Sequence, residues 1–181
     1  MKQSITTKTG DGGTTHLYSG EEVPKDSPRP DACGDVDELC SLLGVARAHS
    51  RRPDIRDAMI EIQRTLFTAA AELATTGERL DRLSSRVDET VLHELEDRRD
   101  KVEAKIRMPK GFVIPGGTIA AAHMDHARCV ARRCERKVVG LFRDGQIRNS
   151  VLLIWFNRLS DYLWLLARCE EGDAVLPKDA E

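Results

Sequence analysis

Closely spaced glycines and threonines near the N-terminus form a candidate anion-binding loop. The segment is Thr7-Lys8-Thr9-Gly10-Asp11-Gly12-Gly13-Thr14-Thr15. Glycines let backbone N–H groups approach a phosphate, while threonine hydroxyls and a lysine add donors and positive charge. The spacing is not that of a Walker motif, and spacing alone favours a plain Gly-rich turn between short strands. Lys25 and Arg29, which follow shortly, add weight to the anion site.

A second candidate is a basic face on a helix predicted from about residue 118 to 141. At about 100° per residue, Arg128, Arg132 and Glu135 lie within about 60° of one another. They face away from an apolar stripe, which consists of His123, Ala127, Val130, Cys134, Val138 and Leu141. A planar guanidinium binds phosphate or carboxylate better than an ammonium group does. The face is therefore either an anion site or a solvated surface of Arg–Glu pairs.

Polar residues interrupt an apolar segment near the C-terminus. The sequence there is Asn157-Arg158-Leu159-Ser160-Asp161. Asn, Ser and Asp are mediocre residues for a helix interior, and buried polar groups need partners. These side chains serve either hydrogen bonds between helices or contacts to a nucleotide.

Two further clusters and the cysteines indicate less chemistry. His123 and His126 are three residues apart, but no Glu-x-x-His motif of the di-iron bundles occurs. Asp35, Asp37 and Glu38 lie near the start of a predicted helix, where acids are electrostatically favoured. The five cysteines have no C-x-x-C spacing, which argues against a disulfide framework or a structural zinc site.

Helices must position these candidates. Apolar residues that recur in steps of three and four predict five helices, over Val36–Ala46, Ile55–Gly77, Val87–Ile106, Thr118–Leu141 and Ile147–Glu170. Asp31 is the expected N-cap of the first helix. Ser85 and Asp88 resemble a capping box at the start of the third. Similar lengths and short loops predict an all-α antiparallel bundle of about five helices.

The expected organisation is a single domain in three parts. Residues 1–30 hold four of the thirteen glycines and are predicted to be an irregular, phosphate-binding segment with a short hairpin. Residues 31–171 form the bundle, and residues 172–181 form a short charged tail.

Composition excludes several classes of protein. The chain has 181 residues and a net charge of -2, which argues against a dedicated nucleic-acid binder. The longest apolar run, Val151 to Phe156, is far short of the ~20 residues that span a bilayer. The polar start lacks the features of a signal peptide. We therefore expect a cytoplasmic protein that binds neither nucleic acid nor membrane.

Six motifs occur in order over residues 7–168. They are Thr7 to Thr15, Lys25-Asp26-Ser27-Pro28-Arg29, Gly34-Asp35-Val36-Asp37-Glu38-Leu39, Phe112-Val113-Ile114-Pro115-Gly116-Gly117, Ala127-Arg128 through Arg132-Arg133-Cys134-Glu135-Arg136, and Asn157-Arg158-Leu159-Ser160-Asp161. Together they resemble the PduO-type ATP:cob(I)alamin adenosyltransferases, a corrinoid adenosyltransferase family.

The resemblance implies a homotrimer of helix bundles with active sites between neighbouring subunits. In this family cob(I)alamin attacks the 5′ carbon of ATP, adenosylcobalamin forms and triphosphate leaves. Since Co(I) is already a strong nucleophile, the protein must position ATP and stabilise the leaving charge rather than supply a base. The implied ligands are ATP, cobalamin and Mg²⁺ held mainly by phosphate oxygens rather than by protein side chains. The implied partners are a cob(II)alamin reductase and an adenosylcobalamin-dependent mutase.

The resemblance also assigns roles to residues. The loop from Thr7 to Thr15 corresponds to the phosphate cradle, with Lys25 nearby. Arg132, Glu135 and Asn157 match nucleotide-contacting positions, and Arg132 would stabilise the leaving triphosphate.

Three further residues match the corrin side of the family's site. Asp35 and Arg128 match a pair that bridges subunits, and Phe112 matches an aromatic residue at the lower axial face of cobalt. With that axial ligand excluded, Co(II) is easier to reduce. Arg132, Phe112, Asp35 and Arg128 are thus the expected catalytic set.

Two departures from the family pattern lie outside the expected catalytic set. Cys40 stands where Asn or Ser is common, and Trp155-Phe156 stand where Tyr-Leu is common. The resemblance also allows an alternative function, an ATP-regulated carrier that delivers adenosylcobalamin to a mutase.

Overall fold

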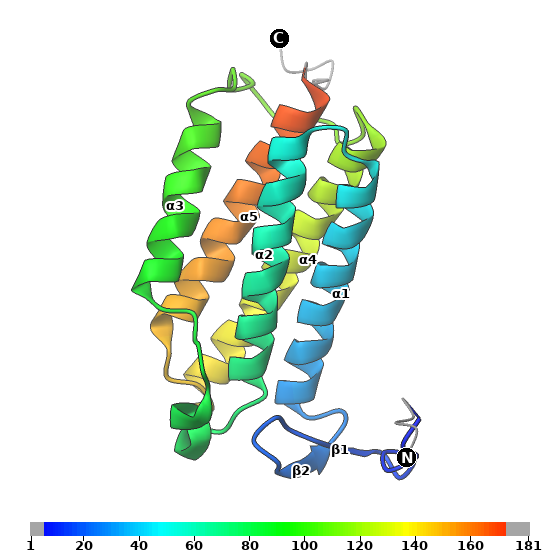
Figure 1. Ribbon diagram of the computed structural model, residues 1–181, viewed down its shortest axis with the longest axis vertical. Helices are drawn as coiled ribbons and strands as arrows, with labels where there is room; N and C mark the ends of the chain where they lie inside the picture. The colour runs from blue at the N-terminus through cyan, green and yellow to red at the C-terminus, as the bar shows by residue number, and fades with distance from the viewer. Residues whose placement is uncertain (1–5, 173–181) are drawn as a thin grey trace.

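Five long α-helices and a small hairpin make up residues 6–172, the part of the chain that the computed structural model describes (Figure 1). The elements are β1 (Thr14–His16), β2 (Glu22–Pro24), α1 (Pro28–His49), α2 (Pro53–Leu73), the 3-10 helix η1 (Gly77–Arg82), α3 (Glu89–Glu103), α4 (Ile119–Arg143) and α5 (Ser150–Glu171). The predicted all-α bundle is confirmed. Residues 1–5 and 173–181, which include most of the predicted charged tail, lie outside the described residues.

Consecutive helices run in opposite directions, with α4 at the centre of the bundle. Helix α4 packs against α1 and α5, while α2 packs against α1 and α3 packs against α5. The β1–β2 hairpin lies beside the start of α1, and residues 104–118 connect α3 to α4 at the other end of the molecule (Figure 1). No helix within residues 6–172 is long and apolar enough to cross a membrane.

The apolar stripes predicted from the sequence form the core. On α4 the predicted stripe is buried from Ala127 to Leu141, whereas His123 is half-buried and stacks on His49 with ring centroids 6.0 Å apart. Burial raises the pKa of the Cys134 thiol to about 12. Trp155 and Phe156 on α5 are among the largest fully buried side chains. Burying each such side chain stabilises the fold by roughly 1.5–3 kcal/mol.

Side-chain caps begin three of the helices. Asp88 is itself the N-cap of α3 and accepts a hydrogen bond from the Val91 N–H (3.0 Å), so the expected capping box of Ser85 with Asp88 does not form. Ser85 lies outside the helix. Thr118 caps α4, and Asn149 caps α5, which therefore starts later than the expected Ile147.

The prediction that Asp31 caps the first helix is wrong. Helix α1 starts at Pro28, since a fixed φ and a missing N–H suit the first helical position. Asp31 instead lies in the first turn and pairs with Lys137 at 2.7 Å.

The second helix stops four residues before Gly77, which was the expected stop. The Arg29 guanidinium is buried at this end and donates to the backbone carbonyls of Leu73, Thr75 and Gln146. It therefore gives a partner to the Leu73 carbonyl, which the end of the helix leaves without a helical one, and ties this end to the loop between α4 and α5.

Candidate functional site

The Gly-rich segment folds back on itself beside the hairpin. The Lys25 N–H donates to the Gly13 carbonyl (2.9 Å), and the Gly13 N–H donates to the Gly10 carbonyl (3.2 Å). Lys8 and Gly13 have positive φ values of 61° and 86°. This backbone encloses a hollow of about 280 Å³, lined by Thr7, Lys8, Thr9, Gly10, Asp11, Thr14, Thr15, His16 and Lys25.

The lining of this hollow suits a phosphate chain. Lys8 and Lys25 bring two positive charges against the single carboxylate of Asp11. Lys25 Nζ crosses close to Gly10, where a Cβ atom would lie only 2.9 Å away. The Thr14 hydroxyl is already used, because it donates to Glu22 at 2.6 Å. Arg29, expected to support this site, points into the bundle instead.

The polar residues of α4 and α5 meet in one network. Asn157 Nδ2 donates to Glu135 Oε1 (2.9 Å), and Arg158 Nη1 donates to Asn157 Oδ1 (2.9 Å). Arg158 Nε in turn donates to Glu96 on α3 (3.0 Å). The amide of Asn157 is therefore held in one orientation between a carboxylate and a guanidinium.

Arg132 lies on the same helix as Glu135, but it faces solvent. Its guanidinium has no ion-pair or hydrogen-bond partner among residues 6–172. A free guanidinium beside a fixed Asn–Glu pair offers a planar fork of donors to an incoming anion.

Asp35 and Arg128 do not pair with each other within one chain. Asp35 is buried and accepts from Arg133 Nε (3.0 Å), with Lys137 Nζ 2.9 Å away. Burial by itself would lower the pKa of Lys137, but its bonds to Asp31 and Asp35 outweigh burial and raise that pKa. Arg128 Nε is buried without a hydrogen-bond partner in the described chain, 4.0 Å from Asp125.

Phe112 lies on the loop of residues 104–118, with 89% of its surface exposed. This loop and the Gly-rich segment are at opposite ends of the bundle (Figure 1). The hollow in the N-terminal segment includes no residue of α4 or α5. Within one chain, the Gly-rich loop lies together with Lys25, and Glu135 lies together with Asn157. These two groups do not meet each other or Phe112.

Sequence reasoning missed two features. The first is the role of Arg133 and Lys137 as partners of Asp35. The usable signal was that Asp31 and Asp35, and likewise Arg133 and Lys137, are four residues apart, so each pair shares one helix face. The second is a cavity of about 530 Å³ near residues 105–110, described below. No group of three His, Cys, Asp or Glu side chains that could hold a metal ion occurs within residues 6–172.

Comparisons with known proteins agree along most of the chain. The family model described as cobalamin adenosyltransferase matches residues 5–170. A corrinoid adenosyltransferase of Citrobacter freundii is 41% identical over 167 residues, which are 92% of this chain and 94% of the relative. One from Bacillus subtilis is 40% identical over 166 residues, 90% of this chain and 83% of the relative.

Two further proteins are similar to this chain over most of its length. The corrinoid adenosyltransferase PduO of Salmonella typhimurium is 37% identical over 171 residues, and the match covers 94% of this chain but 51% of that relative. The chain thus spans about half the length of that protein. A solved structure is also similar, with a TM-score of 0.87 and 32% identity over 97% of each chain. It is a variant PduO-type ATP:corrinoid adenosyltransferase from Lactobacillus reuteri complexed with cobalamin and ATP.

Proposed function

The chain belongs to the cobalamin adenosyltransferase family, a family of transferases, and from this premise we propose that it transfers the 5′-deoxyadenosyl group of ATP to cob(I)alamin. Cobalt(I) donates an electron pair to the 5′ carbon of ATP. The bond between that carbon and its phosphate oxygen breaks, and triphosphate leaves with the electrons of the bond. The products are adenosylcobalamin and triphosphate.

The free guanidinium of Arg132 is the observation that carries this proposal. The reaction needs no base, but it needs positive charge where the triphosphate develops. Arg132 supplies a guanidinium without a competing carboxylate among residues 6–172, and the neighbouring Glu135–Asn157 pair at 2.9 Å offers polar groups to the nucleoside. The hollow around Lys8 and Lys25 takes the phosphates.

The active protein is a homotrimer with sites between subunits. Three observations support this proposal. The phosphate hollow is lined only by residues of the N-terminal segment. Arg128 Nε is buried without a hydrogen-bond partner in the described chain, and Phe112 is 89% exposed. A neighbouring copy could complete each of them. In the trimer, Arg128 joins Asp35 across the interface and Phe112 contacts the corrin.

Mg²⁺ enters with ATP in this proposal. Mg²⁺ in nucleotide sites is bound by substrate phosphates with one or two carboxylates at most, and Asp11 is the one carboxylate that lines the phosphate hollow. The reaction takes place in the cytoplasm, where the five free cysteines stay reduced. A reductase supplies cob(I)alamin, and a mutase receives the product.

An anaerobic assay tests the proposed function. Reduced cobalamin and ATP are mixed with the protein, and formation of the cobalt–carbon bond is followed by absorbance. We expect one triphosphate for each adenosylcobalamin, from a species with the mass of a trimer by light scattering. A folded trimer that binds adenosylcobalamin but forms none would identify a carrier instead.

Gly10→Ala is expected to weaken ATP binding about tenfold. A Cβ atom at Gly10 would lie 2.9 Å from Lys25 Nζ and 3.1 Å from the Thr14 carbonyl oxygen, so the lysine must leave its place in the hollow. Loss of one charge-assisted hydrogen bond costs roughly 1.5 kcal/mol, which is about tenfold in the Kd. Calorimetric titration with Mg–ATP measures it. Gly140→Ala is the control, because a Cβ atom there meets nothing within 4 Å and Gly140 lies on α4, outside the phosphate-binding segment. Equal losses in both variants would contradict the assigned role of Lys25.

Arg158→Gln is expected to raise the KM for ATP about fivefold and to change the melting temperature little. Arg158 binds the Asn157 side-chain oxygen (2.9 Å) and is half-buried, so its removal frees the amide to rotate. A hydrogen bond of this kind contributes roughly 1 kcal/mol. Steady-state kinetics at saturating cobalamin measure the effect. Arg64→Gln breaks an exposed ion pair with Glu61 and should leave the KM unchanged. A lower melting temperature with an unaltered KM for ATP would show that Arg158 stabilises the fold and does not orient Asn157 for ATP.

A further inference from the structure

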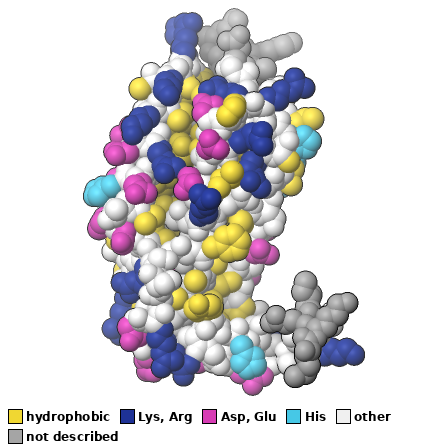
Figure 2. All heavy atoms as spheres, viewed as in Figure 1, with side chains coloured by type: hydrophobic (Ala, Val, Ile, Leu, Met, Phe, Trp, Pro, Cys, Tyr) yellow, Lys and Arg dark blue, Asp and Glu magenta, His cyan; other side chains and the backbone are white. Residues whose placement is uncertain are grey.

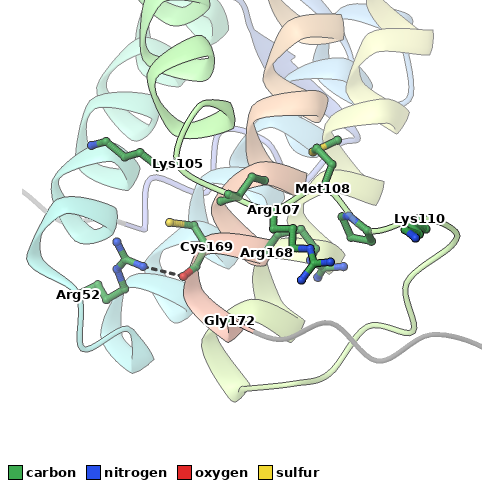
Figure 3. A pocket seen from close by; sticks show the side chains of 10 residues that line it. Arg52, Lys105, Arg107, Met108, Lys110, Arg168, Cys169 and Gly172 are labelled. Atoms are coloured by element: carbon green, nitrogen blue, oxygen red, sulfur yellow. Dashed lines mark hydrogen bonds between the residues drawn. The ribbon is translucent and has the colours of Figure 1, made fainter.

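A basic cavity of about 530 Å³ lies against residues 105–110, in the same connection between α3 and α4 that carries Phe112. It is formed by the last turn of α5, the residue before α2 and the loop that follows α3 (Figure 3). Its lining residues are Arg52, Lys105, Ile106, Arg107, Met108, Pro109, Lys110, Arg168, Cys169 and Gly172. Small-molecule sites in proteins have volumes of about 300–1,000 Å³.

The cavity has more positive charge than the fold itself uses. Five of its lining residues are cationic and none is acidic. Arg52 is engaged with Asp54 (2.8 Å) and the Cys169 carbonyl (2.7 Å), and Arg168 is buried with Asp125 and Glu171.

The other three cations are Lys105, Arg107 and Lys110, and none of them has an ion-pair partner in the part of the chain that the structure describes. Like charges gathered on six consecutive residues repel one another. An anion in the cavity would relieve this repulsion.

The same loop also supplies apolar surface. Ile106, Met108 and Pro109 alternate with the three cations along the lining, and Met108 is 49% exposed. Thioether and aliphatic groups pack well against an aromatic ring. The cavity therefore suits a ligand that joins an aromatic ring to an anion, rather than a bare anion.

Chain connectivity links the cavity to the corrin position in the proposed function, on which this inference rests. Lys110 is two residues before Phe112, so their Cα atoms are at most about 7 Å apart. Cobalamin carries an aromatic base on a phosphodiester arm, and this arm hangs from the lower face of the corrin. When Phe112 occupies the lower face, the displaced arm must lie near the residues that precede Phe112.

We propose that this cavity binds the phosphodiester-linked nucleotide arm of the corrinoid, with Arg107 and Lys110 at the phosphate and Met108 against the base. The arm is then a recognition element rather than a spectator. Binding it away from cobalt also holds the corrinoid in the form without a lower nitrogen ligand, which is the form that accepts an electron and reacts.

The test compares two corrinoids, because cobinamide lacks the phosphodiester and the base. The double variant Arg107→Gln, Lys110→Gln is titrated, in its ATP-loaded state, with cob(II)alamin and with cob(II)inamide, and binding is followed by absorbance. The Kd for cobalamin should rise about 10- to 30-fold, as expected for two charge-assisted hydrogen bonds that are partly replaced by water. The Kd for cobinamide should stay within about twofold. Added salt should weaken cobalamin binding by the wild-type protein more than cobinamide binding.

The charge-matched control is Arg86→Gln, Lys101→Gln, which removes two exposed cations that do not line the cavity. It should bind both corrinoids as the wild type does. Equal losses for cobalamin and cobinamide, or none for either, would overturn the proposal. A loss of inorganic triphosphate binding with cobalamin binding intact would overturn it too, since the cavity would then serve the leaving group. If the wild type binds cobalamin through this cavity but adenosylates neither corrinoid, the proposed function fails and this inference stands.

Discussion

Arg132→Ala should lower the turnover number about 10²- to 10³-fold, comparable to the loss of a donor to a developing oxyanion. The triphosphate gains negative charge as its bond to the 5′ carbon breaks, so a guanidinium at that place stabilises the transition state more than it stabilises bound ATP. Because Arg132 is exposed and has no partner within residues 6–172, its removal leaves no buried charge behind. The melting temperature should therefore stay near that of the wild type.

Arg136→Ala is the matched control for this variant. Arg136 is one turn further along α4, is also exposed, and also forms no ion pair within the described chain. Single-turnover rates with preformed cob(I)alamin and saturating ATP separate chemistry from binding and from reduction. The control should stay within about twofold of the wild type. If both variants lose the same single-turnover rate, the effect reflects the general positive charge on α4. If Arg132→Ala stays fully active, Arg132 does not bind the phosphates.

The helices could be predicted because their burial follows the helical period. On α4, residues Ala127, Val130, Cys134 and Val138 recur at steps of three and four, and all four are buried. This pattern is local, so a single sequence contains it. The N-terminal hairpin was likewise indicated by glycines and prolines, and β1 pairs with β2 in antiparallel fashion.

The errors arose where distant residues decide a local structure. Arg29 looked like part of an anion site because it is close in sequence to Lys25, yet it is buried against the carbonyls of Leu73, Thr75 and Gln146. Those partners are 44 to 117 residues away along the chain. The same contacts lie at the end of α2, which stops before Gly77. No local pattern contains this information.

The candidate site was predictable residue by residue but not as an assembly. The motifs identified Arg132, Glu135 and Asn157, and the last two do form a hydrogen bond. Within the chain Asp35 binds Arg133, 98 residues away, and its expected pairing with Arg128 across a subunit boundary stays a prediction. The basic cavity draws Arg52 and Arg107 from separate segments, so only the folded chain reveals it.

Phe112→Ala should slow adenosylation about tenfold or more when the reaction starts from cob(II)alamin, and much less when it starts from preformed cob(I)alamin. Co(II) binds a lower axial ligand that Co(I) does not hold, so a side chain that keeps water and the base away from this face favours reduction. A tenfold change in a one-electron equilibrium corresponds to about 59 mV. Because 89% of the Phe112 surface is exposed in the single chain, its truncation opens no cavity in the core and should not destabilise the fold.

Three measurements separate this role from simple loss of binding. The Kd for ATP, from calorimetry, should be unchanged. The absorbance signature of cobalamin without axial ligands should decrease in the ATP-loaded variant. Ile114→Ala, which shortens a half-exposed side chain on the same loop, should keep both rates. If Phe112→Ala instead slows the cob(I)alamin reaction as much as the cob(II)alamin reaction, its side chain positions the corrin ring and does not control the coordination of cobalt.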